Sequence, residues 1–283
     1  MKRFFYSGCS FTRSPYPTWG DIVAYDKLNY KGYEFAYNLA TGGGCNQLIA
    51  SRLAWADIKY NFTDQDDIAI LWTTLFRESV LTTWFDEPHT RWHAYGNSFN
   101  NHLWAEITNQ PYLHNLYNML DRNMSIFHYV NKLYKPFYQG RMGNDSGVGY
   151  EKSYESIKEA EVVKPMLANF SGQHEKYLEK FWYEYQNLDA FNYNFNAPQS
   201  QISQLFNNHP DILQHLDHAQ KVANLDSRTV AYFESFSDEL ISIIQKRIND
   251  SSLKQSIATC DLLKDFRNNS GITGITDLLP DYI

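Results

Sequence analysis

Strand-like and helix-like segments alternate over the first 72 residues, and this alternation constrains the fold more than any other feature of the chain. Strands are expected near residues 3–7, 34–39 and 68–72. The last of these is a continuous apolar run, typical of a strand covered on both faces. Helices are expected over residues 17–28 and 46–60, where apolar residues recur at helical intervals. This β-α-β-α-β order predicts a parallel sheet with right-handed crossovers.

The strand pattern fades between about residue 76 and residue 200. Helices are expected within residues 101–135, 154–168 and 174–185, whereas the glycine-rich segment 139–150 is interpreted as a loop. A complete sheet requires a further strand before residue 205, and the sequence pattern does not place it.

The last third is dominated by helical patterns, which cover residues 211–224 and 228–248. We therefore predict a three-layer α/β/α sandwich with a parallel, flavodoxin-like sheet, a helical insertion and a helical C-terminus. The predicted α/β domain spans residues 1–225, with its insertion at about 85–200. Residues 226–283 are expected to be a helical extension.

Composition narrows the class of partner. The chain has 283 residues and a net charge of −7, which argues against nucleic acid as the main ligand. No apolar run approaches the ~20 residues of a membrane span, and the N-terminal segment reads as a strand rather than a signal peptide. The three cysteines show no metal-ligand spacing, so we expect a reduced, cytoplasmic protein without a metal or cofactor.

Small polar residues follow each of the three expected strands. Ser10 lies on the turn after the first strand, three glycines at 42–44 follow the second, and Thr73 and Thr74 follow the third. Because ligands of open α/β sheets bind at the carboxyl ends of the strands, these positions form a candidate site. For Ser10 the alternatives are a nucleophile beside the positive end of a helix and a serine that satisfies its own turn. Cys9 is a second candidate nucleophile.

The glycine loop has three interpretations: an oxyanion hole, a flexible turn and a phosphate cradle. No lysine follows the loop as it does in a phosphate-binding Walker motif. The histidines at 215 and 218, together with Asp211 and Asp217, are expected to form a solvated helix face rather than a metal site.

Four short blocks stand out in this order: Gly8-Cys9-Ser10, Asn38-Leu-Ala-Thr-Gly-Gly43, Leu71-Trp72-Thr73-Thr74 and Asn207-Asn208-His209-Pro210. Together they resemble the sequence blocks of the SGNH, or GDSL-like, hydrolase family, in particular a divergent branch found in phage and bacterial genomes. The resemblance covers roughly residues 1–80 and 200–224.

The resemblance implies roles for individual residues. Ser10 would be the nucleophile and His209 the base, while Gly43 and Thr74 would donate hydrogen bonds to the oxyanion. Asn46 is expected to cap the second helix and to contact substrate, and Arg77 to pair with an anionic substrate or with a surface carboxylate. The first strand should lie between the other two, because that order brings Ser10, Gly43 and Thr74 together.

The sequence also departs from the family pattern. Cys9 replaces the family aspartate, Thr74 replaces an asparagine amide donor, and Asn207 stands where the triad carboxylate is expected. The expected function is hydrolysis or transfer of an ester on a small or carbohydrate-linked substrate. One alternative is a catalytically weak or inactive binding or structural protein on the same scaffold. Another is transfer from a nucleotide-linked donor. Oligomeric state is not predicted.

Overall fold

The computed structural model describes residues 1–42, 44–73, 75, 78–83, 90–95, 110–142, 172–191, 209–249 and 260–274. Its elements, in chain order, are β1 (Arg3–Gly8), α1 (Trp19–Tyr30), β2 (Phe35–Asn38), α2 (Asn46–Tyr60), β3 (Asp66–Trp72), β4 (Glu78–Thr83), β5 (Thr90–Tyr95), α4 (Gln110–Tyr134), β6 (Tyr138–Met142), α7 (Gly172–Gln186), β7 (Asp189–Phe191), α9 (Ile212–Val222), α10 (Ser227–Asn249), α11 (Asp261–Asn269) and β8 (Ile272–Thr273).

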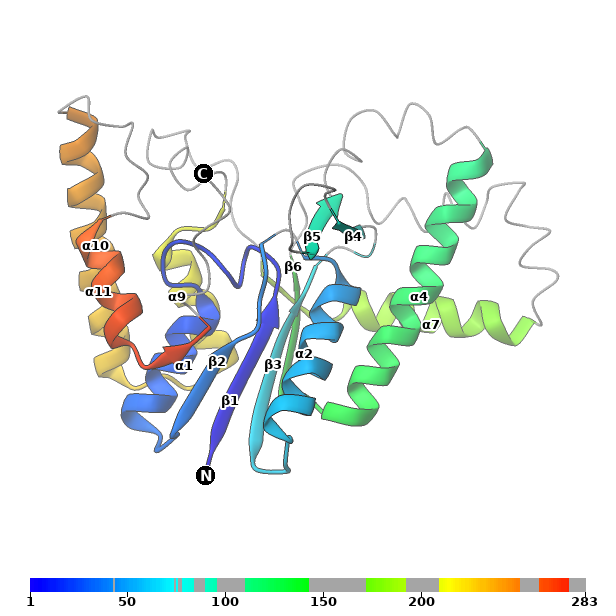
Figure 1. Cartoon of the computed structure of the whole chain (residues 1–283), viewed down its shortest axis with the longest axis horizontal. Coiled ribbons are helices and arrows are strands. Elements are labelled where there is room, and N and C mark those ends of the chain that lie inside the picture. Colours follow the sequence, from blue (N-terminus) through cyan, green and yellow to red (C-terminus); the bar gives the residue numbers. More distant parts are fainter. Residues whose placement is uncertain are drawn as a thin grey trace. The chain divides into compact units, whose positions relative to one another are not determined.

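The fold is mixed α/β with a parallel sheet, as predicted. The strand order is β7-β6-β3-β1-β2-β8, and β4 and β5 form a separate antiparallel pair (Figure 1). Strand β1 pairs in parallel with β2 on one side and β3 on the other, which confirms the prediction that the first strand lies in the middle. The order β2-β1-β3-β6-β7 is flavodoxin-like. From β1 the chain adds β2 on one side of the sheet and then β3, β6 and β7 on the other, so the topological switch point lies between β1 and β3.

The chain divides into two compact units. One comprises Met1–Gly42, Arg52–Leu71 and Tyr193–Ile283, and the other comprises Gly43–Ser51 and Trp72–Asn192. Both units interleave along the sequence, because the chain leaves the first unit after β2 and again after β3.

Three layers build the first unit around β1. The ring of Tyr6 meets Trp19 of α1, with ring centroids 6.4 Å apart, whereas Phe5 meets Tyr60 of α2 at 5.6 Å. Alternate side chains of a strand point to opposite faces, so α1 and the second half of α2 cover opposite faces of β1. Gly20 allows the close approach, since a Cβ at this position would lie 2.2 Å from the Tyr6 ring.

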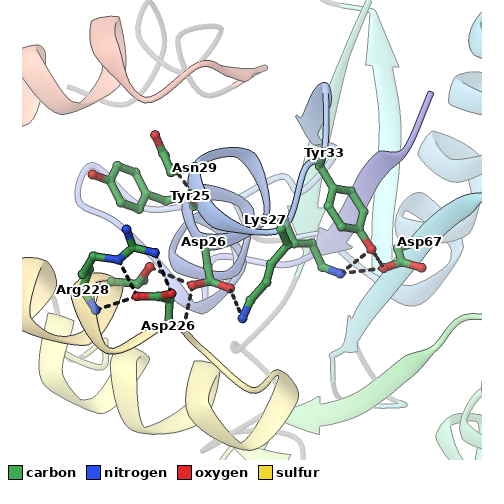
Figure 2. Close-up of polar contacts among 10 residues, drawn as sticks. Tyr25, Asp26, Lys27, Asn29, Tyr33, Asp67, Asp226 and Arg228 are labelled. Carbon is green, nitrogen blue, oxygen red and sulfur yellow. Dashed lines mark hydrogen bonds and ion pairs between the residues drawn. The ribbon is translucent and has the colours of Figure 1, made fainter.

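Polar contacts anchor α1 at its C-terminal end (Figure 2). Lys27 Nζ donates to Asp67 Oδ2 at 2.5 Å and to the Tyr33 hydroxyl at 3.0 Å, and Tyr33 donates to the same carboxylate. The neighbouring Asp26 accepts from the backbone N–H of Asp226 at 2.8 Å, which joins α1 to the start of α10. The contacts with Asp67 lie at the amino end of β3, at the opposite end of the strand from the candidate site.

The second unit contains strands as well as helices. Helix α7 matches the prediction for residues 174–185, and α4 matches the described part of the prediction for residues 101–135. The loop predicted at 139–150 is wrong over Gln139–Met142, which belong to β6. Polar residues alternate there with buried positions, so no apolar run marks the strand. The helix predicted at 154–168 lies outside the described residues.

The C-terminal third of the chain contains the expected helices and one strand that the sequence pattern did not indicate. Helices α9 and α10 confirm the predictions for 211–224 and 228–248. Strand β8 pairs in parallel with β2 and ends at Thr273; the next residue, Gly274, has a φ of +81°, which suits glycine. Residues after α10 therefore complete one side of the parallel sheet.

Candidate functional site

Ser10 lies on a tight turn directly after the central strand β1. The N–H groups of Thr12 and Arg13 donate to the Cys9 carbonyl at 2.9 and 3.1 Å, which closes the turn around Ser10. Ser10 is half-buried, and neither its amide nor its hydroxyl is hydrogen-bonded to another described residue. Cys9 is fully buried, which argues against the alternative that it is the nucleophile.

Thr12 holds this turn from several directions. Its hydroxyl accepts from the Trp19 indole N–H at 3.1 Å, and its carbonyl accepts from the Thr18 hydroxyl at 3.0 Å and from the Asn38 amide at 3.2 Å. Thr12 also folds over Gly8, because a Cβ on Gly8 would lie 2.1 Å from the Thr12 hydroxyl oxygen. The glycine before Ser10 is therefore required by the close approach of Thr12.

A buried polar network lies beneath the turn. Asp21 accepts from the Tyr6 hydroxyl at 2.5 Å, from the Thr18 N–H at 2.8 Å and from the Asn38 amide at 3.0 Å. Burial raises the pKa of the Asp21 carboxyl, while the hydrogen bonds from Tyr6, Thr18 and Asn38 oppose that shift. Burial and the nearby carboxyl raise the pKa of Tyr6 well above its ordinary value.

Asp21 is not among the residues predicted from the sequence, although its spacing from Thr18 carries a signal. Thr18 and Asp21 have the three-residue spacing of a capping box, which places an acceptor near the first N–H groups of a helix. The network joins β1, β2 and α1 through Tyr6, Asn38 and Asp21, so it fixes the base on which the Ser10 turn rests.

His209 lies against the same turn. Its ring packs edge-on against Phe11, the residue after Ser10, with ring centroids 5.4 Å apart and an interplanar angle of 66°. The structure therefore brings the His209 segment to the Ser10 turn, but no hydrogen bond joins the two side chains within the described part of the chain. Asp211 serves as the N-cap of α9 and accepts from the Gln214 N–H at 2.9 Å.

The prediction that His215 and His218 form a solvated face is wrong. Their exposed fractions are 0% and 2%, and both pack against the start of α1. His215 Nδ1 accepts from the Trp19 backbone N–H at 3.2 Å, and the His218 ring stands edge-on to the Trp19 ring at 5.7 Å. Burial lowers the pKa of His215 well below its ordinary value and that of His218 to about 3.

These contacts also correct the expectation about the helix dipole. Helix α1 begins at Trp19, eight residues after the Ser10–Phe11 pair, and side chains take its first donors. The Thr18 N–H donates to Asp21, and the Trp19 N–H donates to His215. The start of α1 is thus capped internally, and we assign it no direct role in binding an anion at Ser10.

Asn46 belongs to the second unit and performs a structural task there. As the first residue of α2, it accepts from the Thr73 N–H at 2.9 Å and donates to the Thr73 carbonyl at 3.2 Å. Its amide also donates to Asn123 at 2.8 Å, and Asn123 donates to the Leu75 carbonyl at 2.8 Å. The side chain expected to cap α2 instead holds the backbone that follows β3.

The remaining site residues, Gly43, Thr74 and Arg77, lie outside the described residues. Within the described ranges, no group of three or more histidine, cysteine or acidic side chains could hold a metal ion. None of the helices searched over those ranges is long and apolar enough to cross a membrane.

The described geometry defines a class: a flavodoxin-like parallel α/β fold with a half-buried serine at the carboxyl end of its central strand. Comparison with protein-family models finds no match, and comparison with curated proteins finds none either. The assignment of function therefore depends on the site itself.

Proposed function

We propose that the protein is a serine-dependent ester hydrolase or acyltransferase of SGNH type, acting on a small or carbohydrate-linked ester. The observation that supports it best is the pairing of the Ser10 turn with His209. The serine is half-buried with no hydrogen bond to another described residue, and the histidine ring packs on the adjacent Phe11. Ser10 also follows β1, which borders the topological switch point between β1 and β3, and open α/β sheets bind ligands at such points.

In the proposed mechanism, Ser10 Oγ attacks the ester carbonyl and His209 accepts the hydroxyl proton. The backbone N–H of Ser10 would donate to the oxyanion, and the resemblance to SGNH hydrolases assigns further donors to the Gly43 N–H and the Thr74 hydroxyl; each well-placed donor contributes roughly 3–4 kcal/mol. The alcohol leaves with the proton from His209. Water or a second alcohol then takes the acyl group from Ser10.

The proposed Ser10–His209 pair lacks the carboxylate that completes the triad in SGNH hydrolases, and this lowers the expected rate of hydrolysis. Asp211, the acidic residue close to His209 in sequence, is engaged as a helix cap. Removing the orienting carboxylate of a catalytic triad costs about 10⁴-fold in rate, although the oxyanion hole and substrate binding retain some catalysis. We therefore expect slow but measurable turnover.

The first prediction concerns the nucleophile and the base. Ser10→Ala should abolish p-nitrophenyl acetate turnover and labelling by a fluorophosphonate probe, and His209→Ala should lower turnover about as much, because members of one catalytic unit are not additive. Cys9→Ala should stay within a few-fold of wild type.

Ser7→Ala is the matched control, since Ser7 lies on β1, three residues before Ser10, with a buried hydroxyl that makes no hydrogen bond among the described residues. Loss of activity on Cys9→Ala with survival on Ser10→Ala would reverse the assignment of the nucleophile. A wild-type protein with neither turnover nor labelling would instead support a binding or structural role.

A further inference from the structure

We propose that Tyr16 is a positioning residue that holds His209 beside the Ser10 turn. This inference rests on the proposed function and adds a residue that the sequence pattern does not single out. Tyr16 lies in the segment between the Ser10 turn and α1, and its side chain is 4% exposed. Its hydroxyl donates to the Pro210 carbonyl at 2.9 Å, across 194 residues of sequence.

The hydrogen bond from Tyr16 to Pro210 restrains the backbone next to His209. Pro210 directly follows His209, and Asp211 then caps α9. Tyr16 therefore fixes the short connection between the proposed base and a helix. Phe11 makes a second contact with this connection, through the ring of His209. Tyr16 and Phe11 both belong to the segment that carries Ser10, so one stretch of backbone positions both the proposed nucleophile and the proposed base.

Tyr16 is itself held in place. The carbonyl of the preceding Pro15 accepts from Arg267 Nη2 at 2.5 Å, and the Tyr16 ring lies 6.1 Å from that of His215. Burial raises the pKa of the Tyr16 hydroxyl far above its ordinary value, so the group stays protonated and remains a donor at neutral pH. A fixed, permanent donor is what a positioning role requires.

The second prediction follows from this geometry. Tyr16→Phe removes only the hydroxyl and should lower kcat by roughly 10- to 100-fold, because small displacements of a catalytic group have effects of that size. KM should change little, since substrate contacts remain. Turnover is measured per folded molecule, with the folded fraction taken from circular dichroism. Tyr33→Phe is the matched control, because it removes a hydroxyl bonded to Asp67 near the amino end of β3 and should leave kcat unchanged.

A second measurement tests position without activity. The imidazole C–H resonances of His209, assigned by comparison with His209→Asn, should be displaced in the wild type by the ring current of Phe11. Tyr16→Phe should move them toward the values of a free histidine, and Tyr33→Phe should not.

Unmoved His209 resonances in Tyr16→Phe overturn the inference, whatever the activity, and so does an unchanged kcat in an active protein. A wild type without turnover or probe labelling overturns the proposed function alone. In that event the His209 resonances still decide whether Tyr16 positions this histidine.

Discussion

At the scale of single residues, Gly8 determines how closely the Ser10 turn can fold against the sheet. A Cβ at this position would lie 2.1 Å from the Thr12 hydroxyl oxygen and 3.1 Å from the Leu71 carbonyl oxygen. The second of these atoms is backbone in the neighbouring strand β3, so it cannot rotate away. The glycine of the Gly-Cys-Ser block thus has a steric reason to be glycine.

The third prediction is that Gly8→Ala destabilises the protein by about 1–3 kcal/mol, the range typical of overpacking. The free energy of unfolding in urea measures the effect. Gly42→Ala is the control, because a Cβ there meets nothing within 4 Å, and its stability should stay close to wild type. Equal stabilities for the two variants would contradict the steric argument.

At the scale of elements, side chains of α2 and α4 organise the backbone after β3. Asn46 satisfies both the N–H and the carbonyl of Thr73, and Asn123 connects Asn46 to the Leu75 carbonyl. Thr73 is fully buried, and Asn46 and Asn123 are nearly so. Buried backbone groups that lose their partners cost free energy, so these amides stabilise the connection after β3.

The fourth prediction is that Asn46→Ala lowers the free energy of unfolding by about 1–3 kcal/mol and accelerates hydrogen exchange of the Thr73 amide. The neighbouring Gln47 is exposed and provides the control, since Gln47→Ala should leave that exchange rate unchanged. Unaltered exchange at Thr73 in Asn46→Ala would show that the hydrogen bond does not protect this amide.

Elements with local signals were predictable, and short or distant ones were not. The run from β1 to β3 follows from apolar periodicity within each segment, and the match extends to α2, which begins at Asn46 as expected. Strand β7 has three residues and β8 has two, too few to show a period. The burial of His215 depends on Trp19, 196 residues away, and no local pattern reports such a contact.

At the scale of the whole molecule, buried histidines link stability to pH. The folded pKa of His218 is about 3, below its ordinary value of 6.5, and burial shifts His215 in the same direction. Between these values the unfolded chain binds more protons than the folded chain. The stabilising contribution of these histidines is therefore fully present above about pH 6.5 and is lost as the pH decreases, for His218 down to about pH 3, by up to about 1.4 kcal/mol per pH unit.

The fifth prediction is that His218→Phe reduces this pH dependence. Urea unfolding at several pH values between 4 and 7.5 should give a shallower slope than wild type, because a titrating group has been removed. His128→Gln, at an exposed position, is the control and should keep the wild-type slope. A His218→Phe slope identical to wild type would mean that His218 binds protons equally in the folded and unfolded chains, which contradicts a lowered pKa in the folded state.

The sequence separation of Ser10 and His209 also determines when the proposed site can form during synthesis. Strand β1 and the Ser10 turn emerge early, but His209 follows about 200 residues later, and β8, the partner of β2, follows later still. At a synthesis rate of ~5–20 residues per second, Ser10 precedes its proposed base by roughly 10 to 40 s. Throughout that interval the Pro210 carbonyl that Tyr16 binds is also missing. A ribosome-bound chain that ends before His209 should therefore carry the serine turn and yet resist acylation.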